Sequence, residues 1–280
     1  IDHRAVPLEV VPLVDAVNDL LRRLNESLAT QKRFLADAAH QLKTPLAGLR
    51  MQADLALREG VSTEDLKRSL QQIGRSSMRA THTVNQLLSL ARAEGASTGL
   101  QRTPCDLAAL AIEVMQDLLP LAMDRHVDMG YEGAEPGSAG VWLQGNATLL
   151  KELIRNLLSN AINYSPSSPE VPAMVTLRVL PDRLSRVVLL QVEDTGPGVP
   201  PEERELIFQP FYRVLGSEAD GSGLGLPIVQ EIARLHAATV ALDDAHPHRT
   251  PPGARFSVRF RALADAPDSE AASADKTSVC

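Results

Sequence analysis

Apolar residues recur at three- and four-residue steps along the first third of the chain. The pattern runs through residues 14–28, continues through 35–49 and returns through 66–91. Such spacing places apolar side chains along one face of a helix. It predicts that residues 10 to about 93 form two long helices.

A short segment, Gly60–Thr63, separates the two predicted helices, and Ser62 or Thr63 can cap the second one. Two amphipathic helices with a short connection are typical of an antiparallel hairpin. One hairpin cannot cover both of its apolar faces, whereas two hairpins packed as a four-helix bundle can. The pattern therefore predicts a homodimer.

The pattern changes after a polar, Gly- and Pro-containing stretch at residues 94–104, which is typical of a linker. From residue 106 to about 261, short alternating segments mix with helical ones, as in an α/β domain. Strands are expected at 127–131, 141–144, 174–180, 186–193 and 255–261, a turn at 181–183, and helices at 106–119, 147–162 and 223–236. The small, polar, acidic tail from residue 262 onward is expected to be disordered.

Composition narrows the classes of function. The chain has 280 residues, a formal net charge of −7 and 3% aromatic residues. It therefore lacks the basic surface and stacking platforms of nucleic-acid-binding proteins. No apolar run approaches the roughly 20 residues that span a bilayer. Cys105 and Cys280 form neither a disulfide framework nor a zinc motif, and because the chain starts with Ile1, it is expected to be a fragment or a processed product.

The first candidate site is His40, which lies about 200° around the predicted helix from Ala38 and Leu42 and should therefore face solvent. Thr44 follows one turn later on the same face. Pro45 removes a helix hydrogen bond and should bend the helix. Taken alone, a surface histidine beside a kink is the simpler interpretation.

Three further motifs could bind a ligand. Residues 152, 156, 160 and 163 (Glu, Asn, Asn, Asn) share one helical sector of roughly 80° and could offer neutral oxygen ligands to Mg²⁺. Asp194–Gly198 ends an apolar strand with a carboxylate and two glycines. Gly221–Ile228 leads into a helix whose free N–H groups could hold phosphate, and Gly216–Gly221 before it could be a lid. Individually, each motif fits an ordinary polar helix face, a turn or a loop.

Together, and in this order, the motifs resemble those of bacterial two-component sensor histidine kinases. The matching segments are AAHQLKTPL (phosphoacceptor box), NLLSNAINYSP (asparagine box), DTGPG (first glycine box), FQPFYR (phenylalanine box) and GSGLGLPI (second glycine box). The resemblance extends from about Gln31 to Phe260. The amino-acid sequence around the histidine is most similar to that of sensors linked to tricarboxylate uptake.

The resemblance implies a multi-domain fold: an all-α helical hairpin that dimerises into a four-helix bundle, then an α/β two-layer sandwich ATP-binding domain of the gyrase, Hsp90 and MutL type. It divides the chain into a HAMP-like helix (1–29), a dimerisation and phosphotransfer domain (30–94), a linker (95–104), a catalytic domain (105–262) and a tail (263–280). A HAMP segment implies that this is the cytoplasmic portion of an inner-membrane receptor.

By the same resemblance, the chain is an enzyme that autophosphorylates His40 from ATP. It then passes the phosphoryl group to an aspartate of a response regulator, expected to be of the OmpR type. Gln41 and Thr44 complete the catalytic set, and Asn160 is the Mg²⁺ ligand. The implied ATP-binding residues are Asn156, Asn160, Asn163, Tyr164, Asp194, Gly196, Gly198, Arg213, Gly221, Gly223, Leu224, Gly225 and Leu226.

Two residues depart from the family pattern. Gln41 stands where an acidic residue usually orients the imidazole and takes its proton, and Gln is no general base. Asn163 stands where Lys or Arg is usual. Thr44 could orient a water that dephosphorylates the regulator, or could simply bond to the carbonyl of His40. The alternatives are therefore an ATP-binding phosphatase scaffold with weak kinase activity, and a non-kinase ATPase of the gyrase and Hsp90 type.

Overall fold

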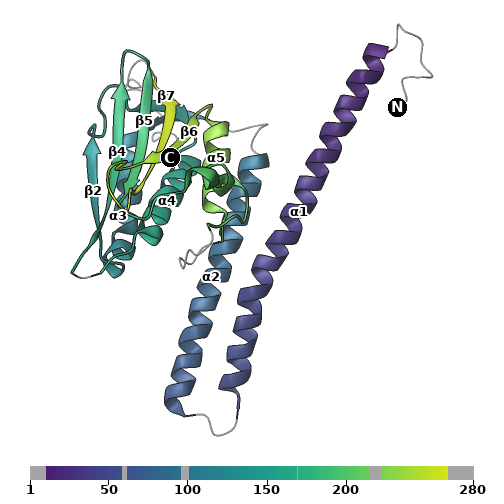
Figure 1. Ribbon diagram of the computed structural model, residues 1–280, viewed down its shortest axis with the longest axis vertical. Helices are drawn as coiled ribbons and strands as arrows, with labels where there is room; N and C mark the ends of the chain where they lie inside the picture. The colour runs from purple at the N-terminus through teal and green to yellow at the C-terminus, as the bar shows by residue number, and fades with distance from the viewer. Residues whose placement is uncertain (1–10, 59–61, 96–100, 169, 215–221, 264–280) are drawn as a thin grey trace, which may run out of the picture. The chain divides into compact units, whose positions relative to one another are not determined.

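The computed structural model describes residues 11–58, 62–95, 101–168, 170–214 and 222–263 (Figure 1). The chain divides into two compact units, Ile1–Asn85 and Gln86–Cys280. The described residues of the first unit lie mainly in two long helices, the second of which continues past the boundary to Gly95. The second contains a β-sheet with helices on one of its faces.

Two helices form the first unit, as the apolar periodicity predicted. Helix α1 (Val11–Ala56) continues as a single helix through Pro45, and α2 (Thr63–Gly95) follows. The Oγ of Ser62 accepts a hydrogen bond of 3.1 Å from the backbone N–H of Asp65, which caps α2. The two helices meet at Gly48, where an added Cβ would lie 3.8 Å from the Oγ of Ser76.

The apolar stripes of this unit are only partly covered within one chain. Leucines on both helices keep 45–67% of their accessible surface, among them Leu20, Leu24, Leu28, Leu46 and Leu70. Exposed leucines at helical spacing indicate a face that a further helix could cover. Among the described helices, none is long and apolar enough to cross a membrane.

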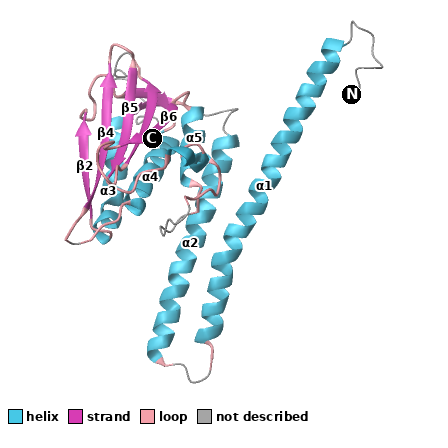
Figure 2. Ribbon diagram, viewed as in Figure 1, coloured by secondary structure: helices cyan, strands magenta, loops and turns pink. Residues whose placement is uncertain are grey.

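The second unit is built on a five-stranded sheet with the order β2-β4-β5-β7-β6 (Figure 2). Its strands are β2 (Val127–Gly133), β4 (Ala173–Asp182), β5 (Val187–Asp194), β6 (Thr239–Asp244) and β7 (Ala254–Arg261). Strand β2 is parallel to β4, and the other neighbouring pairs are antiparallel. A separate two-stranded sheet pairs β1 (Thr103–Asp106) with β3 (Trp142–Gly145).

Three helices cover one face of the large sheet: α3 (Leu107–Asp124), α4 (Ala147–Tyr164) and α5 (Gly225–Leu235) (Figure 1). The sheet supplies alternate buried residues to this layer, such as Val188, Leu190 and Val192 of β5. Side chains of α4, including Leu153 and Leu157, are also fully buried. The helical hairpin followed by an α/β two-layer domain agrees with the expected fold class.

The structure differs from the predicted elements at several places. Strands β1 and β6 were not predicted, and β1 includes Thr103 and Pro104 from the expected linker. Pro181 and Asp182 continue β4, so the turn begins later, where the carboxylate of Asp182 accepts from the backbone N–H of Leu184 at 3.0 Å.

The expected tail starts too early, because Ala262 is buried and bridges to Leu143, and the N–H of Leu263 donates to the O of Trp142 at 2.7 Å. The rest of the tail, from residue 264, and the proposed lid, Gly216–Gly221, lie outside the described residues.

Candidate functional site

The asparagine helix and the second glycine motif lie against each other in the second unit. Gly225 opens α5, and an added Cβ there would stand 3.1 Å from the Oδ1 of Asn156 and 3.4 Å from the Oδ1 of Asn160. Both asparagines are on α4. The backbone at the start of α5, with N–H groups that lack partners within the helix, therefore meets two amide side chains.

The two amides differ in how they are held. Asn156 is buried, and its Nδ2 donates to the backbone O of Glu152 at 2.9 Å and to the Oε1 of Glu152 at 3.3 Å. This orients its Oδ1 toward Gly225. Asn160 is half-buried one turn further along, and Asn163 is half-buried in the last turn of α4. The oriented amide of Asn156 and the half-buried amide of Asn160 thus both lie at the start of α5.

A buried carboxylate ends strand β5. Asp194 is 5% exposed, and its Oδ1 accepts hydrogen bonds from the backbone N–H groups of Gly196 at 2.8 Å and Ala254 at 3.1 Å. Burial raises the pKa of Asp194, the nearby charge of Glu193 adds to this, and the two backbone hydrogen bonds oppose it. The carboxylate is therefore positioned as a fixed hydrogen-bond acceptor.

The glycines after Asp194 permit close backbone contacts. A Cβ on Gly196 would stand 2.8 Å from the carbonyl O of Tyr164, the last residue of α4. Gly198 has a φ of +74° and faces Pro252. The end of the asparagine helix and the first glycine motif are therefore in direct contact.

The loop between β6 and β7 also forms part of this region, and the sequence analysis did not single it out. A Cβ on Gly253 would lie 2.1 Å from the carbonyl O of Asp194, and the N–H of Gly253 donates to the O of Gly196 at 3.1 Å. The dipeptide Pro251-Pro252 immediately before this glycine was the available signal for a constrained turn.

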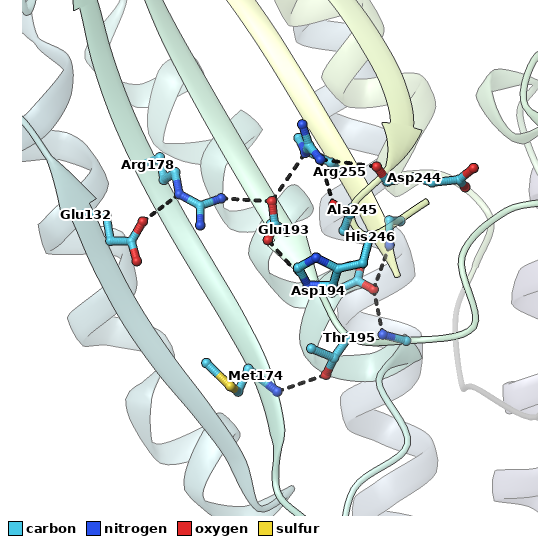
Figure 3. Close-up of polar contacts among 12 residues, drawn as sticks. Glu132, Met174, Arg178, Glu193, Asp194, Thr195, Asp244, Ala245, His246 and Arg255 are labelled. Atoms are coloured by element: carbon cyan, nitrogen blue, oxygen red, sulfur yellow. Dashed lines mark hydrogen bonds and ion pairs between the residues drawn. The ribbon is translucent and has the colours of Figure 1, made fainter. Parts of the chain in front are cut away.

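The neighbour of Asp194, Glu193, points to the opposite face of the sheet and anchors an ionic cluster there (Figure 3). Its carboxylate lies 2.8 Å from Nη1 of Arg178 on β4 and 3.2 Å from Nε of Arg255 on β7. His246 Nε2 is 3.6 Å from it. These contacts tie the end of β5 to both neighbouring strands and to the β6–β7 loop.

The second glycine motif is held by the phenylalanine motif. The N–H of Phe211 donates to the O of Gly223 at 2.8 Å, and a Cβ on Gly223, whose φ is +71°, would lie 2.7 Å from the backbone of Phe211. Leu224 is buried, Leu226 is half-buried and Arg213 is exposed. Gly221 lies outside the described residues.

His40 is exposed on α1 in the first unit, as its helical position predicted, while Ala38 is buried. The Oγ1 of Thr44 lies 3.5 Å from the carbonyl O of His40, a distance at the limit of a hydrogen bond. Gln41 follows His40 in the same helix.

Side chains near the start of α5 include oxygen donors that could bind a metal ion. No group of three or more His, Cys, Asp or Glu side chains that could hold a metal occurs among the described residues. The half-buried amide of Asn160 is a neutral oxygen donor of the kind Mg²⁺ accepts when phosphate oxygens and waters supply its other ligands. The residues present therefore fit an ion carried in with a phosphate ligand.

Comparison with known proteins agrees with this architecture. Residues 30–96 match the His Kinase A (phospho-acceptor) domain, and residues 145–264 match the Histidine kinase-, DNA gyrase B-, and HSP90-like ATPase family. The sensor protein kinase PmrB of Pseudomonas aeruginosa is 39% identical over 85% of this chain and 48% of its own length. QseC of Escherichia coli strain K12 is 36% identical over 86% of this chain and 51% of its own length.

Solved structures share the fold. The histidine kinase ThkA in complex with the response regulator TrrA aligns with a TM-score of 0.62 at 18% identity, covering 87% of this chain and 65% of that one. The Acinetobacter baumannii histidine kinase AdeS aligns with a TM-score of 0.57 at 19% identity, covering 79% and 97%.

A helical hairpin joined to an ATPase-type sandwich, with these motifs in this order, defines a two-part kinase core. The chain belongs to the sensor histidine kinase family. It spans about half the length of the curated relatives it matches.

Proposed function

We propose that this chain autophosphorylates His40 from ATP and passes the phosphoryl group to an aspartate of a response regulator. The observation that carries the proposal is the convergence of Asn156, Asn160 and Gly225 beside the end of α4, which also contacts the motif of Asp194. An exposed histidine within the His Kinase A segment supplies the acceptor.

The adenine end of ATP is assigned to the Asp194 motif. The fixed carboxylate of Asp194 accepts from the exocyclic amino group, a contact that guanine, with a carbonyl there, cannot make. Gly196 and Gly198 shape this end of the pocket, and Tyr164 lines it. The support is the burial of Asp194 and its two backbone hydrogen bonds, which leave its second oxygen for a ligand.

The phosphate end is assigned to the start of α5. Backbone N–H groups around Gly223, Leu224, Gly225 and Leu226 hold the phosphates. The family pattern adds Gly221 and Arg213 to this set. Mg²⁺, when bound, neutralises phosphate charge, and Asn160 holds it with support from Asn156. Asn163 supplies an amide where a cation is usual in the family, so one phosphate contact is weaker.

In the transfer itself, an imidazole nitrogen of His40 attacks the γ-phosphorus of ATP. The N–P bond forms as the bond from phosphorus to the β–γ bridging oxygen breaks, and ADP leaves. Gln41 can orient the ring but cannot take its proton at neutral pH. The proton therefore passes to water, and the reaction is expected to be slower than with a carboxylate at this position.

Thr44 is assigned a role in dephosphorylating the response regulator. Its hydroxyl, one helical turn from His40, orients a water for hydrolysis of the phosphoaspartate on the regulator. The distance of 3.5 Å from Oγ1 to the carbonyl O of His40 leaves the hydroxyl free to serve a second partner. The chain is thus proposed to act as both kinase and phosphatase.

A second candidate function is an ATP-binding phosphatase scaffold with little kinase activity, and Gln41 is the observation that favours it. A third, a non-kinase ATPase of the gyrase and Hsp90 type, leaves the His Kinase A segment unused. We therefore rank it last.

The wider setting is proposed from the family. The hairpin forms a homodimer, residues 30–94 and 105–262 are the two functional domains, and the partner is a response regulator, which we place in the OmpR class. ThkA, whose fold is shared, was solved with a response regulator. The segment 1–29 is proposed as a HAMP-like relay in a membrane-anchored receptor, similar to sensors linked to tricarboxylate uptake.

The test is labelling with ATP carrying a labelled γ-phosphate. The wild type should acquire an acid-labile, base-stable label that disappears in His40→Ala. His82→Ala, a histidine on the other helix of the same unit, is the matched control and should keep the label. Label that survives in His40→Ala would overturn the assignment, and ATP binding without any label would favour the scaffold.

A further inference from the structure

A buried histidine outside the motifs joins the two helices of the nucleotide site at their far ends. His236 directly follows α5 and is 7% exposed. Its Nε2 lies 3.0 Å from the backbone N of Asn146, and its Nδ1 lies 2.7 Å from the carbonyl O of Ile232. An amide N–H can only donate and a carbonyl can only accept, so the ring is neutral with its proton on Nδ1.

The surroundings of the ring are shaped to hold it in this place. A Cβ on Gly145 would stand 2.9 Å from the Cδ2 of His236, so only glycine lets the ring approach. Phe260 packs against it edge-on, with ring centroids 6.4 Å apart. Arg102 donates to the carbonyl O of Leu235 at 2.6 Å, which fixes the end of α5.

The contact partner of His236 is also the start of the asparagine helix. Asn146 is the N-cap of α4, and its side chain accepts from the N–H of Leu149 at 3.1 Å. Helices α4 and α5 are thus antiparallel and held at two points. His236 meets Asn146 at one end, and Gly225 meets Asn156 and Asn160 at the other.

The spacing of the two contact points agrees along both helices. From Gly225 to His236, eleven residues at about 1.5 Å each span ~17 Å, which falls between the ~15 Å from Asn146 to Asn156 and the ~21 Å from Asn146 to Asn160. A shift of one helix along the other would therefore break both contacts together. The histidine contact and the phosphate end of the site share one register.

We propose that His236 is a positioning residue that fixes the register of α5 against α4, and thereby the distance between the phosphate-binding backbone of α5 and Asn160. The proposal rests on the proposed binding of ATP at this site. His236 acts on the phosphate end only, because Asp194 is held separately by β5 and by the loop before β7.

The test compares two substitutions, each of which can keep only one of the two hydrogen bonds that the His236 ring makes. His236→Gln reaches as far as Nε2 and can still accept from Asn146, whereas His236→Asn reaches only as far as Nδ1. Dissociation constants for Mg²⁺-ATP and for adenosine are measured on the full chain by calorimetry. His126→Asn is the control, because His126 is an exposed histidine of the same unit with a φ of 55° that Asn tolerates.

His236→Asn should weaken Mg²⁺-ATP binding about tenfold, the equivalent of one lost hydrogen bond to a buried group. Adenosine affinity should stay within about twofold, and His236→Gln should bind both ligands like the wild type. An unchanged ratio of ATP to adenosine affinity in folded His236→Asn would overturn the proposal, because it would show a role in stability only.

Gly145→Ala provides the same test if His236→Asn does not fold, because the added methyl would stand 2.9 Å from the ring, as well as 2.8 Å from Leu143 and 2.9 Å from Leu150. It should also weaken ATP and spare adenosine, and equal loss of both would overturn the proposal. If the wild type binds ATP no better than adenosine, the proposed function fails first, and that result is distinct from either of these.

Discussion

At the scale of single residues, Asp194 is expected to favour ligand binding and to lower the stability of the fold. Its carboxylate is buried, and burial raises its pKa, so its charge costs free energy in the folded protein. Because the folded pKa is raised, the folded state binds a proton more readily than the unfolded state, and this group destabilises the fold at neutral pH.

Asp194→Asn keeps the size and one carbonyl oxygen of the side chain but removes the charge. We expect the variant without ligand to melt no lower than the wild type at pH 7, while its affinity for ATP falls at least about tenfold because a fixed acceptor for the adenine amino group is lost. Thermal unfolding and calorimetry measure the two effects. A variant that loses stability and keeps ATP affinity would contradict this role.

Gln41 offers a second prediction at this scale. Gln41→Glu places a carboxylate beside His40, which can take the imidazole proton, so the rate of phosphohistidine formation should rise about tenfold or more. Single-turnover labelling with γ-labelled ATP measures the rate. Gln41→Ala is the matched control and should be no faster than the wild type. Equal rates for Gln and Glu would show that proton removal does not limit the reaction.

At the scale of elements, periodicity predicted what the local pattern determines. Alternating buried residues located β4 and β5, and three- and four-residue spacing located α1 through α4. Strand β6 was not predicted because its residues Thr239, Ala241 and Asp243 are exposed. Its pairing with β7 forms only in the folded domain. Strand β1 was not predicted because Thr103 and Pro104 have the composition of a linker.

The same limit applies to the candidate site. The asparagines and glycines stand in local motifs, so they could be named from the sequence, although their roles remain predictions. The contacts of Gly253 with Asp194 and of His236 with Asn146 join residues that are 59 and 90 positions apart. No local pattern encodes such pairs, because only the closed sheet and its helices bring them together.

The junction of α4 and α5 also predicts how the second unit responds to acid. Burial lowers the pKa of His236, and the charge of Arg102, the cation beside it, adds to this. A histidine with a depressed folded pKa contributes stability above its unfolded pKa of about 6.5, and that stability is lost as pH falls toward the folded value. Acidification should therefore remove the contribution of His236, while protonation of Asp194, whose pKa is raised, acts in the opposite direction.

Urea unfolding of the full chain, followed by the fluorescence of Trp142, measures this effect. Trp142 is the single tryptophan and lies on β3 in the second unit. Between pH 7.5 and 5.5 the wild type should lose more stability than His236→Gln, which has no titrating ring. Parallel losses in the two proteins would mean that another group governs the acid response.

At the scale of the whole molecule, the exposed leucines of the hairpin require a partner. Leu24 of α1 and Leu70 of α2 keep 53% and 57% of their surface exposed in a single chain. Fully burying an exposed leucine contributes about 1.5–3 kcal/mol, and about half of that remains for a leucine that is already half-buried. A two-fold symmetric dimer buries each position twice, so one charged substitution should weaken association by roughly 1.5–3 kcal/mol, about tenfold or more in affinity.

Leu70→Glu should therefore convert a dimer into a monomer at micromolar concentration, as measured by light scattering after size-exclusion chromatography. Leu184→Glu is the matched control, because Leu184 is 99% exposed at the turn after β4 in the second unit and should leave the dimer intact. Because the two substitutions add the same charge, a difference between them isolates the hairpin face. If Leu70→Glu stays dimeric at the wild-type dissociation constant, α2 does not contribute this face to the interface.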